Sequence, residues 1–256
     1  MILCFSRRSS TLRMASSTLT LRSPSDVILF WYGGNPKAEG AFDSKEVIYP
    51  RMKKWYSIGG EDPGFSAVQR SNESLIARVA SGARTRPRGT EEEDGKYHEA
   101  ALPWGQENHP ESILAAVLVL DQFPRTVFRG TPQAFENDEI ASTIVMNVMK
   151  DRGDQYILDN FTPVERMFLA TSLQHSETSE GQALSLQMAE LVPVGDKSGV
   201  VDVRAYCKSH AMVIEQFGRF PGRNNALGRE STKEEIEWLE SPDCPEWAKS
   251  QLAPKT

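Results

Sequence analysis

The sequence is poor in the residues from which most metal and redox sites are built. It contains three cysteines and four histidines among 256 residues. Cys4, Cys207 and Cys244 lie far apart, and no CxxC, HExxH or Glu-x-x-His segment occurs. Zinc and thiol redox sites need such spacings. We therefore expect no metal site and no cofactor, and the cysteine usage favours a reducing compartment.

Signatures of several common classes of protein are also missing. The phosphate-binding patterns GxGxxG and GxxxxGK[ST] and the serine nucleophile elbow GxSxG do not occur. The longest strongly apolar run, residues 113–120, has eight residues, whereas a membrane-spanning helix needs about 20. A net charge of −6 disfavours general attraction to nucleic acid. We expect no nucleic-acid partner and no membrane insertion.

Residues 1–25 lack acidic side chains altogether, and they contain four arginines and many serines and threonines. This composition is typical of a mitochondrial transit peptide, although a clear amphipathic stripe is absent. A disordered tail, or an upstream start that precedes a second start at Met14, also explains it, and Ser/Arg-rich tails are common. We expect this segment to lie outside the folded domain of a cytoplasmic protein, with mitochondrial import as the alternative.

What the sequence does contain is a series of helix start and stop signals. Ser23 or Ser25 can cap a helix that ends at the pair Gly33 and Gly34. Proline near the start, acids in the first turn and apolar residues at three-to-four spacing mark the others. They predict helices over residues 110–123 with Pro124 as the stop, from Thr131 and Pro132 to Gly153, from a capping box at Thr162 and Glu165, over residues 201–217, and from a capping box at Ser231 and Glu234.

These signals predict an all-α fold of stacked antiparallel helical hairpins, resembling a tetratricopeptide-repeat-like array. Strand-like alternation is nowhere sustained, and residues 191–203, the one segment that suggests it, are interrupted by Pro193 and two glycines. We expect one domain over residues 26–240 with a charged loop or insertion near 81–108, and a C-terminal tail over 241–256. Residues 42–56, broken by Pro50, stay unassigned.

Three polar side chains are predicted on the apolar faces of their helices. Asp121 follows Leu114 by seven positions, and His175 and His210 follow apolar residues at the same spacing. A buried carboxylate must be paired or hydrogen-bonded. A histidine there is either satisfied by a carbonyl or hydroxyl, or acts in proton transfer. Candidate catalytic residues are therefore His175, the nearby Glu177 and His210.

Two arginine-rich loops resemble each other, DQFPRTVFRG at 121–130 and EQFGRFPGRNNALGR at 215–229. Arginine suits planar recognition of carboxylate or phosphate, so these loops suggest a site for an anion. The alternative is structural, with the arginines bound to helix carbonyls and to the inward carboxylates Asp121 and Glu215. The candidate ligand-binding residues are Asp121, Arg125, Arg129, Glu215, Arg219, Arg223, Asn224 and Arg229.

Three longer motifs together resemble one known family. LVLDQFPRTVFRGT at 118–131, FLATSLQHSE at 168–177 and SHAMVIEQFGRFPGRNNALGREST at 209–232 are similar to the uncharacterised family catalogued as domain of unknown function 924. VILFWYGG at 27–34 and KKWY at 53–56 look like its opening motifs. The resemblance implies an all-α, tetratricopeptide-repeat-like fold over about residues 26–240, and no established reaction.

Two departures from the family pattern stand out. The family usually reads Phe-Pro-His-Arg-Asn where this chain has Gly222 in place of the histidine. If that histidine does chemistry, this chain has lost it. The charged insertion near 81–108 is also longer than the resemblance implies.

The sequence leaves two functions open. The first is a pocket, lined by arginine and histidine, for a small molecule that carries a carboxylate or phosphate, with enzymatic activity undecided. The second is a helical scaffold that binds a peptide or protein partner, in which the arginine loops are structural.

Overall fold

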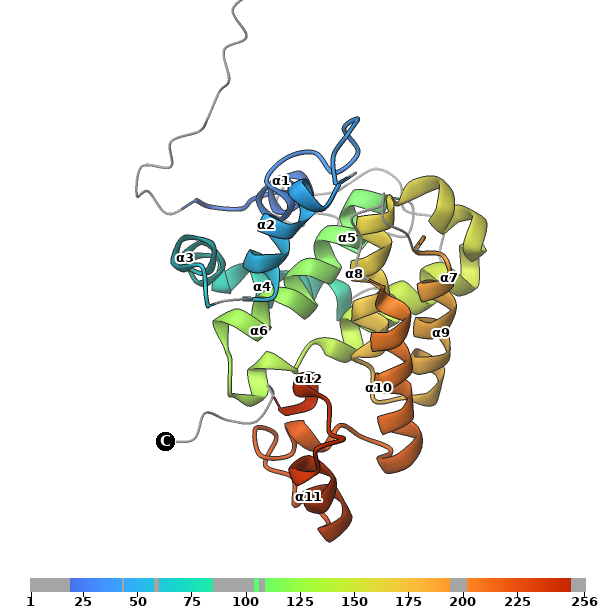
Figure 1. Cartoon of the computed structure of the whole chain (residues 1–256). Coiled ribbons are helices and arrows are strands. Elements are labelled where there is room, and N and C mark those ends of the chain that lie inside the picture. Colours follow the sequence, from blue (N-terminus) through green and yellow to red (C-terminus); the bar gives the residue numbers. More distant parts are fainter. Residues whose placement is uncertain are drawn as a thin grey trace, which may run out of the picture.

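The fold is described by a computed structural model that covers residues 19–42, 44–57, 60–84, 104–105, 109–193 and 202–249. Among these residues every regular element is a helix, which confirms the all-α class (Figure 1). The likeness to a tetratricopeptide-repeat array stays a prediction. Most of the expected N-terminal tail, of the charged insertion and of the segment 191–203 lies outside the described residues. None of the described helices is long and apolar enough to cross a bilayer.

The helices follow one another in the order shown by the colours of Figure 1. They are α1 (Pro24–Tyr32), α2 (Lys45–Trp55), α3 (Pro63–Ser71), α4 (Glu73–Arg84), α5 (Pro110–Val117), the π-helix η1 (Leu118–Gln122), α6 (Phe123–Val127), the 3₁₀ turn η2 (Pro132–Ala134), α7 (Asp138–Asn160), α8 (Pro163–Gln174), α9 (Ser179–Glu190), α10 (Val203–Phe217), the 3₁₀ turn η3 (Pro221–Arg223), α11 (Lys233–Glu240) and α12 (Glu246–Lys249).

Helix α1 begins and ends as its sequence predicts. Ser23 is the N-cap and forms a capping box with Asp26, and Gly33 ends the helix in the left-handed conformation at φ 74°. Arg51 of α2 donates from Nε to the Trp31 carbonyl oxygen at 2.6 Å. This bond satisfies a carbonyl that the end of α1 leaves without a helical partner. Helix α2 runs through Pro50 and supplies the assignment that the sequence left open.

The central helix passes Pro124 instead of stopping before it. Residues 113–120 are at most 1% exposed, as expected for a core helix. The chain then widens into η1, where the Phe123 N–H bonds the Leu118 carbonyl five residues back. Pro124 follows at the start of α6, where a proline needs no N–H partner. The predicted stop at Phe123 is therefore wrong, because the π-turn accommodates the proline.

Helix α7 also differs from its prediction. Thr131 and Pro132 begin only the 3₁₀ turn η2, and α7 itself starts at Asp138. Gly153 has φ 74° and ψ 178° inside α7, so the helix breaks there, as its glycine suggested, and then resumes to Asn160. Thr162 and Glu165 form the predicted capping box of α8, and α10 spans the predicted segment with Asp202 as its N-cap.

Apolar side chains gather in two separate clusters. The large one includes the stacked and edge-on rings of Trp31, Trp55 and Phe168 and the buried face of every helix from α1 to α9 together with the first turns of α10. The small one holds Val213, Ile214 and Phe220, with three further aromatic rings packed against them. We call residues 19–212 the body and residues 213–249 the C-terminal module. In Figure 1 the module lies below the body.

The expected C-terminal tail has structure of its own. Its residues up to 249 include α12, and Cys244 and Ala248 are 3% and 2% exposed. Trp247 of α12 packs against the module's apolar cluster. This part of the segment 241–256 therefore belongs to the folded module.

Candidate functional site

Asp121 lies inside the protein at the π-turn η1, with no exposed surface. Its Oδ1 atom lies 2.8 Å from His175 Nδ1 and 3.1 Å from Arg125 Nη1. Gln122 donates from Nε2 to the other carboxylate oxygen. Burial opposes ionisation of Asp121, but the charge of Arg125 and the contacts with His175 outweigh it and lower the pKa of the carboxyl to about 2. The predicted buried, paired carboxylate is thus present.

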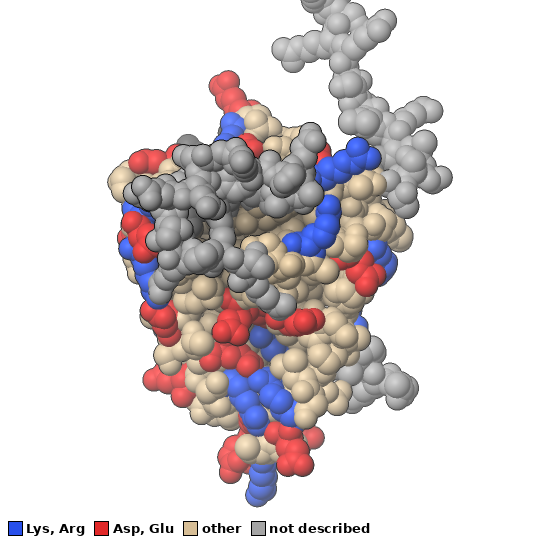
Figure 2. Space-filling model, turned by 180° about the vertical axis from the view of Figure 1, so that it is seen from behind, with Lys and Arg blue, Asp and Glu red and all other residues tan. Residues whose placement is uncertain are grey.

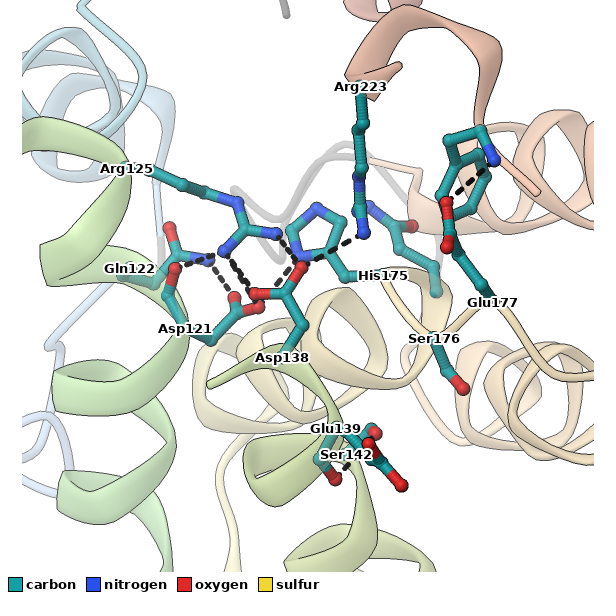
Figure 3. A network of polar contacts seen from close by, with 12 residues as sticks. Asp121, Gln122, Arg125, Asp138, Glu139, Ser142, His175, Ser176, Glu177 and Arg223 are labelled. Atoms are coloured by element: carbon teal, nitrogen blue, oxygen red, sulfur yellow. Dashed lines mark hydrogen bonds and ion pairs between the residues drawn. The ribbon is translucent and has the colours of Figure 1, made fainter. Parts of the chain in front are cut away.

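Asp138 is the member of the site that the sequence did not single out. It stands at the first position of α7, where an acid is ordinary, and it is 5% exposed. Arg125 binds both its oxygens at 2.9 Å, and Arg223 Nη1 lies 3.1 Å from Oδ2. Figure 3 shows the two guanidinium groups reaching Asp138 from different elements, with His175 beside them. Asp138 therefore joins the two arginine loops.

Arg223 crosses from the C-terminal module to the body. Its guanidinium carbon lies 4.5 Å from the centre of the Phe220 ring and 4.9 Å from that of Phe135. Phe220 belongs to the module and Phe135 follows η2 of the body. With 3% of its side chain exposed, the arginine fills the junction between the two regions by stacking as well as by charge.

His175 is a neutral imidazole held in one tautomer. Burial and the nearby charge of Arg125 lower its pKa, against the opposing effect of Asp121. Because ionised Asp121 only accepts hydrogen bonds, the proton on His175 sits on Nδ1. Its Nε2 atom then carries a lone pair, and we find no hydrogen-bond partner for it among the described residues. A carboxylate-oriented imidazole of this kind can act as a base.

His210 has the same tautomer for a different reason. Its Nδ1 lies 2.8 Å from the Tyr206 carbonyl oxygen, which can only accept. Burial, followed by the proximity of His175, holds the pKa of His210 well below its usual value. The centres of the two imidazole rings are 5.9 Å apart, and the Trp247 ring stacks on His210 at 3.6 Å. The structure thus brings the two histidines side by side, with the pKa of each lowered.

Glu177 binds the second arginine loop. Its carboxylate accepts from Arg229 at 2.7 and 3.0 Å and from the Phe220 backbone N–H at 2.8 Å. Burial raises the pKa of Glu177, but these hydrogen bonds exceed that effect and lower it overall. Glu177 is therefore an ionised anchor for the module rather than a proton donor near neutral pH.

Arg219 and Asn224 both bind Glu235 of α11. Arg219 donates to Glu235 at 2.6 and 2.8 Å, and Asn224 donates to it at 3.1 Å. Glu235, not Glu234, closes the capping box of α11, and its partner is Thr232. The predicted box at Ser231 and Glu234 is wrong by one position. Glu235 can be buried to 2% exposure because the arginine and the asparagine compensate it, which fixes this register.

Two predicted ligand residues lie away from the site. Glu215 and Arg129 are both exposed, and Arg129 acts on the pKa of Glu61 rather than on Asp121. Glu215 was expected to point inward, but the inward face of α10 at this end is taken by Val213 and Ile214. The inward placement expected of Glu215 is therefore wrong, and Arg129 lies apart from the other candidate residues.

The remaining residues form a charged seam between the body and the C-terminal module. Its members are Asp121, Arg125, Asp138, His175, Glu177, His210, Arg223 and Arg229. The three acids compensate the three arginines, and both histidines are neutral. The charges of the seam's described ion pairs therefore balance, and they leave no excess positive charge to attract an anion.

Two cavities lie elsewhere in the fold. One of about 820 Å³ is lined by residues of α4 and by Phe128, Gln133 and Glu136. The other, of about 360 Å³, lies beside Gly33 and Arg51. Neither is lined by a residue of the charged seam. Among the described residues, no three His, Cys, Asp or Glu side chains are grouped as a metal site would require.

Fold and site together define an all-α protein in which an Asp-His pair and a second histidine lie in a charge-balanced seam. The family described as "Bacterial protein of unknown function (DUF924)" matches residues 27–243, and the chain belongs to this family. No curated protein matches the chain. A solved structure, that of a protein of unknown function, ATU0120, from Agrobacterium tumefaciens, is 24% identical and covers 85% of this chain and 96% of its own, with a TM-score of 0.47.

Proposed function

We propose that the charged seam binds a small molecule bearing a carboxylate or phosphate group, and that His175 exchanges a proton with it. The observation that carries this proposal is the 2.8 Å contact between His175 Nδ1 and the ionised, buried Asp121. That contact orients the ring and leaves the lone pair of Nε2 for another partner. Burying a carboxylate completely costs free energy. A functional role for the histidine that Asp121 orients would explain why the fold accepts this cost.

The charge balance of the seam sets the form in which an acid would bind. An anion placed near Nε2 of His175 or His210 would raise the pKa of that histidine, because an opposite charge favours the protonated form. Binding would then take up a proton, so the affinity for the anion would fall as the pH rises. Arg125 and Arg229, with 20% and 25% of their side chains exposed, lie where they could orient the acidic group.

The test uses His175→Asn, because the asparagine amide can keep the donor to Asp121 while the Nε2 lone pair is lost. The purified protein is screened by ligand-observed NMR against small carboxylic acids and phosphate esters, beside extraction of co-purifying acids and mass spectrometry. We expect an acid that binds the native chain at least about tenfold more tightly than the variant. His109→Asn, at an exposed histidine, serves as the control and should bind normally.

Calorimetry of the acid found in that screen, in buffers with different heats of ionisation, then measures the protons taken up. We expect uptake of up to one proton per acid bound near pH 7. Equal binding by the native chain and by His175→Asn, or no binding of any acid in the screen, would rule the proposal out. A chemical change in the bound acid over time would identify the chain as an enzyme.

A helical scaffold is the second candidate, and one observation favours it. Arg125, Arg219, Arg223 and Arg229 already bind carboxylates of the same chain, which is what purely structural arginines would do. The cavity of about 820 Å³ is lined by the apolar residues Ile76, Ala77 and Phe128 together with polar ones, and Ala77 is exposed, so it could receive a peptide.

Different variants should abolish binding under the two proposed functions. Peptides selected for binding from a displayed library should lose binding to Ala77→Arg and keep it with His175→Asn if the scaffold function is correct. The acid-binding function predicts the reverse pattern for the acid. On the face shown in Figure 2, basic and acidic side chains of the described residues lie close to one another, which gives neither partner a broad surface of one charge.

A further inference from the structure

The segment 244–249, which we call the C-terminal strap, lies directly on one histidine of the proposed site. The Trp247 ring is nearly parallel to the His210 ring, with the centres 3.6 Å apart and the planes inclined by 14°. Its Nε1 donates to Ser209 Oγ at 2.9 Å. Trp247 also meets Phe220 edge-on at 5.8 Å. One face of His210 is therefore covered by the strap.

The strap packs closely against the loop that carries Arg223. A Cβ atom built on Gly222 would lie 2.3 Å from the carbonyl oxygen of Ala248. That distance is far inside van der Waals contact, and the opposing atom is backbone, which cannot rotate away. The lack of a side chain at Gly222, where the sequence resemblance implies a histidine, is what lets the strap lie against η3.

The strap is short and is held by ring contacts and a hydrogen bond of Trp247. Its helix α12 has four residues, too few to be stable without tertiary contacts. Its ion pair, Lys249 with Glu246, is internal and 4.0 Å long, and the salt bridges among the described residues include none from the strap to the rest of the chain. A four-residue helix that depends on tertiary contacts opens at a lower free-energy cost than the helices of the core.

We infer that the C-terminal strap is a lid over the histidine pair, and that its release from Gly222 and His210 opens the seam to a ligand. This inference rests on the proposed function of the seam, because a lid regulates only a site that is used. In the closed state Trp247 occupies the face of His210. Access to the histidines then depends on how often α12 detaches from η3 and His210.

The lid is tested without any ligand, by the rate at which diethyl pyrocarbonate modifies each histidine near pH 7. The reagent attacks the neutral imidazole, and exposed His109 provides an internal reference within the same chain. Gly222→Ala should force the strap off its seat, and Trp247→Ala should remove the stacked ring. We expect both variants to raise modification of His210 at least about fivefold relative to His109. Glu246→Ala, at a side chain that is 94% exposed, should leave it unchanged.

Hydrogen exchange followed by mass spectrometry separates an open lid from a damaged module. An open lid predicts faster exchange in residues 244–249 and unchanged protection in α10 and α11. If exchange also accelerates throughout α10 and α11, the strap is an integral part of the module and the inference is overturned. An unchanged His210 rate in both variants overturns it as well. If the acid screen fails while the strap opens as expected, only the proposed function is lost.

Discussion

Different kinds of contact hold the body and the C-terminal module in place. The body is closed by apolar packing, with Phe168 in contact with the rings of Trp31 and Trp55 and without exposed surface. The module has a small apolar cluster of its own, and the charged seam supplies ion pairs across its junction with the body. Apolar contacts do not depend on direction, whereas ion pairs demand a fixed geometry. We therefore expect the seam to orient the module against the body, and the apolar packing of the body to supply most of the stability.

The largest expected effect comes from breaking the body. Phe168→Ala should lower the free energy of unfolding by about 3–5 kcal/mol, because it leaves a cavity among aromatic rings that cannot collapse. Phe220→Ala is the matched variant in the module, where the phenylalanine is 1% exposed. Hydrogen exchange should then accelerate in residues 213–249 and stay slow in α5 and α8. Uniform acceleration in both variants would show that body and module unfold as one unit and would remove the distinction.

The next effect comes from the seam. Asp138→Asn keeps the shape of the side chain but takes away the charge shared by Arg125 and Arg223. Because it leaves the buried guanidinium group of Arg223 undercompensated, we expect the free energy of urea-induced unfolding to fall by about 3 kcal/mol. The double variant with Arg223→Met should lose less than the two single variants added together. Strict additivity would mean that the ion pair does not couple the two regions.

The sequence predicts the parts of the seam that lie on one helix but not the pairing between helices. Asp121, His175 and His210 stand at apolar positions of their own helices, and all three are buried. Asp138 gives no such signal, because an acid in the first turn of a helix is common. Its partners are fixed by the packing of α6, α7 and η3, which spacing along the chain does not specify. The sequence did not predict the contact of Trp247 with His210 for the same reason.

Helix boundaries show the same limit. Capping boxes and glycine stops place the ends of α1 and the start of α8 correctly. The predicted stop at Pro124 is wrong because no sequence pattern predicts a π-turn. The predicted capping box of α11 is wrong by one position because both Glu234 and Glu235 lie three residues after a serine or threonine. In the second case, tertiary contacts with Arg219 and Asn224 decide the register.

A smaller effect should appear as the pH is lowered. The pKa values of His175 and His210 are lowered by folding, so the unfolded chain binds protons that the folded one excludes. Stability should therefore decline as the pH falls below about 6.5, the usual pKa of histidine, with a slope of up to about 1.4 kcal/mol per pH unit for each group. Asp121 adds to the decline below about pH 4. His210→Phe keeps a ring beneath Trp247 and should make the free energy of unfolding less dependent on pH between pH 7 and 5. The measurement is urea-induced unfolding at several pH values. An unchanged dependence on pH would contradict the neutral state assigned to His210.

The smallest effect is expected at an ion pair outside both the core and the seam. Lys233 and Glu237 form a pair one helical turn apart on α11, at 3.4 Å and with 84% and 64% of their side chains exposed. Water screens such charges, so Glu237→Gln should change the free energy of unfolding by less than about 0.5 kcal/mol. Measured in the same urea series as Asp138→Asn, this variant separates the effect of burial from that of charge removal. A loss as large as that of Asp138→Asn would mean that net charge, and not the geometry of the seam, holds the module in place.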